Sequence, residues 1–344
     1  MNLLVTGGAG FIGSNFVQYM LEKYAELKIV NLDRLTYAGN LESLSDVMGN
    51  PRHTFIQGDI CDQALIHHLF EKYEIDGVIH FAAESHVDNS IKNPRSFIDS
   101  NIVGTFTLLE TARRHWMDGV NVFKQGYKNA RFHHISTDEV YGTLGKEGYF
   151  TENSIYAPNS PYSASKASSD MIVRSYFHTY GMNVVTTNCS NNYGPQQHDE
   201  KLIPTIIRKA LSLESIPIYG NGQNVRDWLY VLDHCRAIEQ VFWKGNSGET
   251  FLIGGHHEKT NIEMAEMICD ILDTLQPISK EDVEVKSYKQ LIEFVQDRPG
   301  HDFRYAIDDS KLRNEIGFEN KYNLEEGIKK TISYYLDKYT IKTY

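Results

Sequence analysis

A glycine-rich loop near the start of the chain constrains the fold more than any other feature. The segment GGAGFIG, residues 7–13, follows an apolar stretch at residues 2–6 and precedes a helical stretch that ends near Tyr24. A strand, such a loop and a helix in this order form a tight turn that brings the backbone close to a pyrophosphate, with the helix N-terminus directed at the anion. Two glycine spacings are open: G-x-G-x-x-G on Gly8, Gly10 and Gly13, or G-x-x-G-x-x-G on Gly7, Gly10 and Gly13.

An acidic residue supports a dinucleotide interpretation of this loop. Asp33 lies twenty residues after Gly13, at the end of a second apolar stretch at residues 28–32. A carboxylate there can hydrogen-bond both ribose hydroxyls and repels a 2′-phosphate, so we expect NAD rather than NADP. The alternative is a glycine-rich turn with a capping acid. Asp59, in GDI, follows the third strand and either meets the adenine edge or caps the next helix.

The alternation of strands and helices predicts the fold class. It continues for about 190 residues and indicates an α/β protein with a Rossmann-type, doubly wound parallel sheet and a smaller, mixed C-terminal lobe. We expect residues 1–191 to form the first domain, with residues 226–254 returning to it, and residues 192–344 to form most of the second lobe. The expected strands are 2–6, 28–32, 54–57, 78–82, 131–136, 183–188 and 250–254, and the expected helices are 62–73, 94–115, 161–180 and 227–243.

Composition narrows the function classes. The net charge is −11, which argues against nucleic-acid and anionic-membrane partners. No apolar run approaches the length of a membrane span, and we expect no secretory leader. The cysteines form no CxxC or Cys/His cluster, so we expect no metal site and a reducing, cytoplasmic setting; they are Cys61, Cys189, Cys235 and Cys269.

Two carboxylates follow a strand in HHISTDEVYG, residues 133–142, and are preceded by a hydroxyl. Thr137, Asp138 and Glu139 could form a hydrated turn, since Thr and Asp favour turns. They could also form a proton-handling site at the end of a buried strand. Neighbouring carboxyl groups in different environments can hold different protonation states, as acid–base chemistry requires.

A tyrosine and a lysine lie one helical turn apart in SPYSASKAS. Tyr162 and Lys166 share one face of the predicted helix. The pKa of a free tyrosine, about 10, makes it a poor base at neutral pH. A lysine ammonium and a positively charged nicotinamide would favour the phenolate, and Thr137 could hydrogen-bond the substrate oxygen that Tyr162 deprotonates.

Eight motifs in order along essentially the whole chain give it a family resemblance. GGAGFIG, AAESHVD, STDEVYG, SPYSASK, NNYGP, EKLIP, RDWLYV and RPGHD resemble the extended short-chain dehydrogenase/reductase family, and within it the 4,6-dehydratases that act on dTDP-glucose. The resemblance implies an NAD-dependent hydro-lyase that feeds deoxysugar biosynthesis, such as that of rhamnose. It also implies a homodimer built through helices, for which residues 94–115 and 161–180 are candidates.

The resemblance assigns roles to residues. Thr137, Asp138, Glu139, Tyr162 and Lys166 are the implied catalytic set, in which Glu139 removes the C5 proton and Asp138 protonates the departing C6 hydroxyl. The implied cofactor contacts are Gly7, Gly10, Phe11, Ile12, Gly13, Asp33, Asp59, Ile60, Ala82, Ala83, Ser85, Ser100, Tyr162, Lys166 and Asn192. The implied substrate contacts are Ser85, His86, Thr137, Asn191, Lys201, Leu202, Pro217, Tyr219, Arg226, Asn261, Arg298 and His301.

The resemblance implies that Arg226 and Arg298 are the diphosphate ligands, a role that suits guanidinium because it is planar and always charged. His86 is equally well explained as a structural histidine. One segment departs from the family pattern: QQHD, residues 196–199, stands where an aromatic and a proline usually precede EKLIP.

Other functions remain open from sequence. A UDP- or CDP-sugar 4,6-dehydratase and a nucleotide-sugar 4-epimerase are alternatives within the family. An epimerase needs no acid pair, because it only oxidises and reduces C4. A non-catalytic NAD-binding scaffold is the alternative from another class, and it would not need the five catalytic residues.

Overall fold

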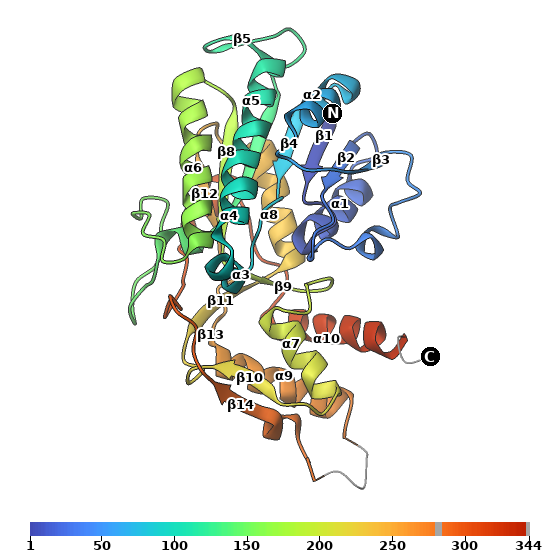
Figure 1. Cartoon of the computed structure of the whole chain (residues 1–344), viewed down its shortest axis with the longest axis vertical. Coiled ribbons are helices and arrows are strands. Elements are labelled where there is room, and N and C mark those ends of the chain that lie inside the picture. The colour runs from blue at the N-terminus through green and yellow to red at the C-terminus, as the bar shows by residue number, and fades with distance from the viewer. Residues whose placement is uncertain (279–283, 342–344) are drawn as a thin grey trace.

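A parallel sheet forms the centre of the protein. A computed structural model describes residues 1–278 and 284–341, and within them seven strands make one sheet in the order β12-β8-β7-β4-β1-β2-β3 (Figure 1). All neighbouring pairs are parallel. The strands are β1 (Asn2–Thr6), β2 (Lys28–Asp33), β3 (His53–Gln57), β4 (Gly77–His80), β7 (Arg131–Thr137), β8 (Val184–Cys189) and β12 (Thr250–Ile253). The predicted fold class is confirmed. The strand order reverses direction at β1, and ligands of such sheets bind at the carboxyl ends of the strands beside that point.

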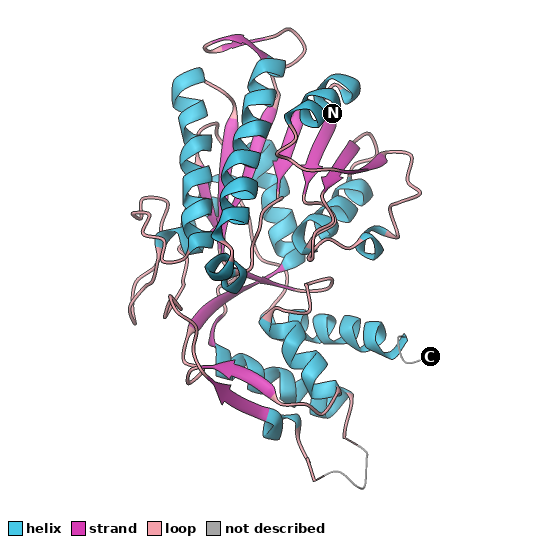
Figure 2. Cartoon of the chain, in the orientation of Figure 1, coloured by secondary structure: helices cyan, strands magenta, loops and turns pink. Residues whose placement is uncertain are grey.

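Helices cover both faces of this sheet, as Figure 2 shows. Side chains alternate along β1, so Leu3 and Val5 pack on one face and Leu4 on the other. The first face packs against α1 (Phe11–Lys23) and α8 (Val231–Lys244), and the second against α2 (Gln63–Tyr73), α5 (Thr105–Trp116) and α6 (Pro161–Tyr180). Each fully buried Leu, Val or Phe contributes about 1.5–3 kcal/mol to folding, so these two cores hold the sheet ends in place.

The expected helix at residues 94–115 is three consecutive segments. They are α4 (Pro94–Phe97), the π-helix η2 (Ile98–Gly104) and α5. The wider π turn directs the Asn101 amide to the backbone O of Glu84 at 3.0 Å and the Ser165 Oγ at 2.8 Å. The turn after β4 and helix α6 are thereby joined through one buried side chain. A π segment within a longer helix is frequently found at a functional site.

A second group of elements lies below the sheet in Figure 1. Its core packs Ile207, Ile268 and Tyr335 from three helices together. The helices are α7 (Leu202–Leu211), α9 (Asn261–Leu275) and α10 (Leu324–Ile341), and the strands are β9 (Asn191–Tyr193), β10 (Ile216–Tyr219), β11 (Val225–Tyr230), β13 (Glu258–Thr260) and β14 (Ile292–Val295). β11 lies between β9 and β13, while β10 pairs with β14.

The prediction of a helix over residues 227–243 is wrong at its start. Residues 225–230 form β11, and the helix α8 begins at Val231. Trp228, Leu229 and Tyr230 are almost fully buried in β11. Their apolar run therefore reflects a strand with neighbours on both edges and not the buried face of a helix.

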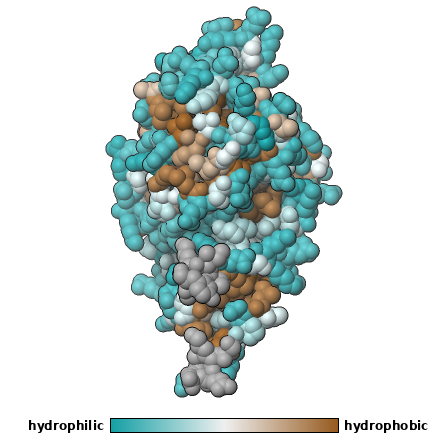
Figure 3. Space-filling view, turned by 90° about the vertical axis from the view of Figure 1, so that its right-hand side faces the viewer, coloured by the Kyte–Doolittle hydropathy of each residue, from teal (hydrophilic) through white to brown (hydrophobic). Residues whose placement is uncertain are grey.

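The remaining elements are short. They are α3 (Val87–Lys92), the hairpin β5 (Met117–Gly119) and β6 (Val122–Phe123), and the helical turns η1 (Leu41–Leu44), η3 (Asp138–Tyr141), η4 (Tyr288–Leu291) and η5 (Leu312–Ile316). Figure 3 shows the right-hand side of Figure 1, where hydrophilic residues predominate and apolar ones appear between them in the upper half. Within residues 1–278 and 284–341, no helix is both long and apolar enough to cross a membrane.

Replacing Gly7 by alanine should destabilise the fold. Gly7 has φ +72°, and a Cβ would lie 2.6 Å from the backbone N of Ala82. We expect Gly7→Ala to lower the free energy of unfolding by roughly 1–3 kcal/mol, because strain in the left-handed region adds to a contact with rigid backbone. Urea denaturation measures the change.

Gly49→Ala is the matched control for this prediction. A Cβ at Gly49 would meet nothing within 4 Å. We expect its effect to stay within about 0.5 kcal/mol. Equal effects of the two substitutions would show that the turn at Gly7 tolerates a side chain.

Candidate active site

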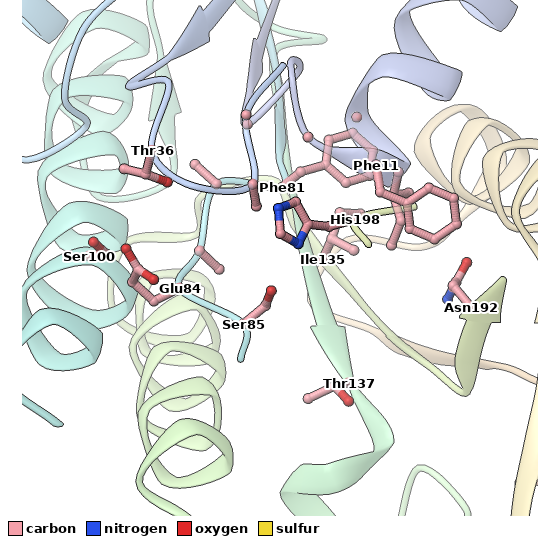
Figure 4. Close-up of a pocket in the computed structure, with 18 of the residues that line it drawn as sticks. Phe11, Thr36, Phe81, Glu84, Ser85, Ser100, Ile135, Thr137, Asn192 and His198 are labelled. Carbon is pink, nitrogen blue, oxygen red and sulfur yellow. The ribbon is translucent and has the colours of Figure 1, made fainter. Parts of the chain in front are cut away.

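A pocket opens at the carboxyl ends of the central strands, at the place where the order of the sheet reverses. Figure 4 shows Phe11 and Asn192 on one side of it, Thr36, Glu84 and Ser85 on the other, and Thr137 at the end of β7. All the implied cofactor contacts line this pocket, together with the implied catalytic set Thr137, Asp138, Glu139, Tyr162 and Lys166. Residues up to 194 positions apart in the sequence, from Gly7 to Lys201, therefore meet in one place.

The glycine loop is shaped by a close backbone contact. The Gly10 N–H donates to the Gly7 O at 3.1 Å, and a Cβ on Gly13 would lie 2.2 Å from that oxygen. Gly7, Gly10 and Gly13 line the pocket, whereas Gly8 packs against the Asn31 side chain. The geometry therefore follows the G-x-x-G-x-x-G spacing.

Asp33 joins the glycine loop to the loop after β2. Its Oδ2 accepts from the Ala9 N–H at 2.9 Å and its Oδ1 from the Leu35 N–H at 2.8 Å, while the side chain faces the pocket. Asp59 lies nearby and pairs with Arg34 at 3.2 Å. The helix-cap alternative for Asp59 is wrong, because Asp62 caps α2.

Tyr162 and Lys166 project into the pocket from the first turns of α6. Ser160 caps this helix and Pro161 occupies its first turn, which fixes where the helix begins. The Lys166 Nζ donates to the backbone O of Ile135 at 2.8 Å. Burial lowers the pKa of Lys166 to about 8, although the nearby Asp170 opposes this shift.

The Tyr162 phenol is held in its neutral form by its surroundings. Burial raises its pKa well above the usual value, and the negative charge of Glu139 adds to the effect. The Thr137 hydroxyl acts in the opposite direction. The Tyr162 phenol therefore loses its proton less readily here than in water, and positive charge nearby would favour its phenolate.

Asp138 is buried and Glu139 is partly buried at the pocket, so the pair does not form a hydrated surface turn. Thr137 caps the helical turn η3 by accepting from the Glu139 N–H at 3.3 Å, and its hydroxyl also donates to the Asp138 Oδ1 at 3.3 Å. The exposed fraction of Asp138 is only 1%. Its buried Oδ2 has no hydrogen-bond partner among the described residues, and Asp138 is one of the residues that line the pocket. A buried polar atom without a partner requires an explanation, and a catalytic role is one such explanation.

The two carboxyl groups experience different electrostatic environments. Burial raises the pKa of Asp138 well above its ordinary value, and the charges of Glu139 and Asp227 raise it further. Burial also raises the pKa of Glu139, but Arg298, Arg226 and Lys201 oppose that shift. Asp138 therefore retains a proton more readily, and Glu139 is the member of the pair that can accept one.

The implied substrate contacts lie in and beside this pocket. Ser85, Thr137, Asn191 and Lys201 line it. Arg226 is 5% exposed, stacks on Tyr305 with its guanidinium carbon 4.3 Å from the ring centroid, and donates to the backbone O of Asp302 at 2.9 Å. Buried atoms without a hydrogen-bond partner in the described part of the chain include the Arg298 Nη1 and the Asn191 Oδ1.

Other implied contacts lie outside the pocket lining. His86 caps α3, and its Nε2 lies 3.6 Å from Glu200. The Tyr219 ring meets that of His301 at 6.2 Å, and the His301 Nδ1 lies 2.6 Å from Asp297. Leu202 opens α7, Asn261 opens α9 and Pro217 lies in β10.

Comparisons with known proteins agree with this geometry. A family profile described as GDP-mannose 4,6 dehydratase matches residues 4–331. The chain is 53% identical over 337 residues to a dTDP-glucose 4,6-dehydratase of Xanthomonas campestris pv. campestris, with 98% of this chain and 93% of the relative covered. It is 52% identical over 340 residues to the enzyme of that name from Neisseria gonorrhoeae, with 98% and 96% covered.

The chain belongs to the dTDP-glucose 4,6-dehydratase family.

Solved structures of this family superpose on the chain. The dTDP-glucose 4,6-dehydratase of Bacillus anthracis, in complex with NAD, is 44% identical with a TM-score of 0.85, and 99% of this chain and 98% of that one are covered. The enzyme from Streptomyces venezuelae, with NAD bound, is 42% identical with a TM-score of 0.87 and the same coverage. A UDP-glucose 4-epimerase of Thermotoga maritima shares the fold at 29% identity, with a TM-score of 0.83 and 98% and 100% covered.

Sequence analysis missed a buried network beside Lys166. The Asp170 carboxylate lies 3.1 Å from the His134 Nε2 and accepts from Ser136 at 2.9 Å and Tyr156 at 3.0 Å. The i, i+4 spacing of Lys166 and Asp170 on one helix was the signal that could have identified it. Pocket residues that were also missed are Leu32, Arg34, Thr36, Ala38, Gly39, Gly58, Phe81, Glu84, Ile135, Ser136, Cys189, Ser190 and Glu200. Gln197 and His198, which belong to the segment that departs from the family pattern, line the pocket as well.

Asp138→Asn should gain stability relative to the wild-type chain as the pH rises. The pKa of Asp138 is raised in the folded protein, so above about pH 4 the native state binds more protons at this group than the unfolded state. The wild type therefore loses stability as the pH rises from about 4 towards the native pKa, and the neutral amide removes this loss. Urea denaturation at several pH values from about 5 to about 8 measures the difference.

Asp46→Asn removes an exposed carboxylate of the same type and serves as the control. Its stability difference from the wild type should stay flat over this range. A flat difference for Asp138→Asn as well would contradict a buried, protonated Asp138.

Proposed function

We propose that this chain catalyses the dehydration of dTDP-glucose to dTDP-4-keto-6-deoxyglucose, as an NAD-dependent hydro-lyase. The observation that carries this proposal is the acid pair that lines the pocket beside Tyr162 and Lys166. Asp138 and Glu139 share one pocket, yet their surroundings favour a proton on Asp138 and a charge on Glu139. An elimination of water needs one acid and one base at neighbouring atoms, which this pair supplies.

The pocket fits a dinucleotide. At Gly7, Gly10 and Gly13 a Cβ would fill the space between the loop and its neighbours, so the backbone itself forms the cradle for a pyrophosphate. Asp33 faces the same pocket from the end of β2 and provides the ribose contact that disfavours a 2′-phosphate. When bound, NAD accepts the C4 hydrogen of the sugar with its electron pair and returns it to C6.

Tyr162 serves the oxidation of C4. Its phenolate takes the proton of the C4 hydroxyl as that carbon becomes a ketone, and Thr137 hydrogen-bonds the same oxygen. The raised pKa of Tyr162 makes the phenolate depend on the charge of Lys166 and of the oxidised nicotinamide. Proton removal is therefore linked to the presence of an oxidised cofactor.

Glu139 and Asp138 serve the elimination. The ketone at C4 acidifies the C5 proton, which Glu139 removes. Asp138 gives its proton to the C6 hydroxyl, which leaves as water. The resulting double bond between C5 and C6 then takes up hydrogen at C6 and a proton at C5. The net reaction removes water, and no oxidant is consumed.

The substrate diphosphate is assigned to Arg226 and Arg298. Arg226 is held by Tyr305 and by backbone oxygens, and the Arg298 Nη1 is buried with no hydrogen-bond partner among the described residues. A planar cation that is already oriented binds a diphosphate with little further ordering.

The wider assignments rest on the same site. Residues 1–191, with 226–254 returning, form the NAD domain, and residues 192–344 mainly bind the nucleotide sugar.

The chain forms a homodimer through α5 and α6, which expose Phe106 and Met171 beside the exposed Ile98 and Val103 of η2. It works in the cytoplasm, in keeping with four free cysteines in the described residues.

The route of the C4 hydrogen tests this function. Substrate deuterated at C4 is turned over in ordinary water, and the product is analysed by mass and NMR. We expect deuterium at C6, because the hydrogen removed from C4 returns to the same sugar. Deuterium lost to solvent, or NADH accumulating with product, would show an ordinary dehydrogenase. A 4-epimerase would release no water.

The acid pair should be required for elimination and not for oxidation. We expect Asp138→Asn with Glu139→Gln to reduce NAD on mixing with substrate, seen as nicotinamide absorbance, yet to form the 4-keto-6-deoxy product at least about 100-fold more slowly. Tyr162→Phe is the matched comparison, since it should lose both product formation and the absorbance change. Normal product formation by the double variant would remove the pair from the mechanism.

Asp33→Asn should weaken selection against NADP. The substitution removes the charge that repels a 2′-phosphate, so we expect the ratio of the NADP and NAD dissociation constants to fall at least about fivefold, the equivalent of about 1 kcal/mol. Binding titrations with both cofactors measure the ratio. Asp46→Asn should leave it unchanged, and a wild type that binds both cofactors equally would contradict the role of Asp33.

A further inference from the structure

The segment that departs from the family pattern forms one wall of the pocket. Gln197, His198 and Glu200 line it. In Figure 4 the His198 imidazole projects into the pocket between the side that carries Ser85 and the side that carries Phe11. The wall, defined as residues 195–200, therefore borders the space assigned to the dinucleotide.

The wall meets the loop after β2. The His198 ring contacts the Tyr37 ring edge to face, with the centroids 5.6 Å apart. The neighbours of Tyr37, which are Thr36 and Ala38, line the same pocket. A dinucleotide bound between the two segments would be bordered by this contact, and its release would require one of them to move.

The start of the wall is fixed to the cofactor domain. The Ser14 Oγ donates to the Gln196 Oε1 at 2.5 Å, and the Asn15 amide donates to the Pro195 O at 3.1 Å. Gln196 has φ +71°, an uncommon value for a residue with a side chain. A strained residue persists only where its surroundings fix it.

The end of the wall is fixed to the C-terminal helix. The Asp199 Oδ1 accepts from the Lys338 Nζ at 2.9 Å and from the Tyr339 hydroxyl at 3.0 Å. The Tyr335 hydroxyl donates to the Gln197 O. The helix α10 packs Ile328 and Ile332 into the core of the second lobe, so it is a rigid support for these contacts.

We propose that α10 is a component of the cofactor site. The helix holds the 195–200 wall through Asp199, and the wall so held retains NAD between the two hydrogen transfers. The proposal rests on the proposed function, in which one cofactor molecule must stay bound from the oxidation of C4 to the reduction of C6. Release between the two steps would leave an oxidised sugar without its reductant. Lys338 and Asp199 are positioning residues. They position His198, whose ring contacts Tyr37.

The experiment measures NAD dissociation in the absence of sugar. NAD-loaded protein is mixed with an enzyme that consumes free NAD, and the dissociation rate and the NAD content after gel filtration are recorded. We expect Lys338→Met to speed dissociation about fivefold, as an ion pair of this type contributes up to about 1 kcal/mol. Lys338→Arg should restore the wild-type rate.

Lys329→Met is the matched control. Lys329 pairs with Glu325 on the exposed side of the same helix, away from the wall, so the same change should leave the rate unaltered. His198→Ala should speed dissociation without altering the ion pair. In the double variant, Lys338→Met with His198→Ala, the increase in the NAD dissociation rate should be smaller than the product of the two single increases. Both substitutions act through one wall.

The outcomes separate this proposal from the proposed function. Wild-type dissociation rates in both Lys338→Met and His198→Ala would overturn the retention role, whether or not the chain is a dehydratase. If the effects of the two changes on the dissociation rate multiply, the inference that both act through one wall is overturned. Faster dissociation in a chain that releases no water from dTDP-glucose would support the wall and reject the reaction. Thermal melting identifies any variant whose loss of NAD reflects unfolding.

Discussion

The contact between Gly7 and the turn after β4 is the constraint on which the site depends. A side chain at Gly7 would lie within 3 Å of the Ala82 backbone, so β1 and β4 can place their ends together only when residue 7 has none. This proximity puts the glycine loop beside the segment from Ala82 to Ser85. The Asn101 amide then connects that segment to α6, which carries Tyr162. The glycine loop and Tyr162 are thus connected by one short chain of contacts.

Burial gives the site its chemistry. Each of these pocket side chains would be ordinary in water, where Asp138 would be ionised and Lys166 would carry a charge at neutral pH. Burial raises the pKa of Asp138 and lowers that of Lys166, so the two values move towards the neutral range from opposite sides. Arg226 opposes the shift at both acids, whereas Arg298 and Lys201 oppose it at Glu139. The difference between the two acids therefore arises from the second lobe, and the site is complete only when both parts of the chain meet.

Local patterns predicted the parts of this structure that depend on local geometry. The glycine loop, the acid after β2 and the Tyr162–Lys166 spacing are each set within one strand–loop or helical turn, and the pocket contains all of them. Contacts distant in sequence were not predictable in the same way. The Asp170 network needs β7 beside α6. The wall at His198 depends on α10, about 140 residues further along the chain.

The order in which the site can assemble follows from where its residues lie in the sequence. The site draws on residues from Gly7 to Arg298, and the sheet that brings them together is parallel, so every neighbouring pair of strands closes a long loop. Such a topology has a high contact order and folds slowly through partly formed states. β12, the last strand of the central sheet to be synthesised, completes the edge of that sheet beside β8. A nascent chain that ends before β12 exposes an apolar sheet edge. It lacks Arg298 as well, so it holds no complete site.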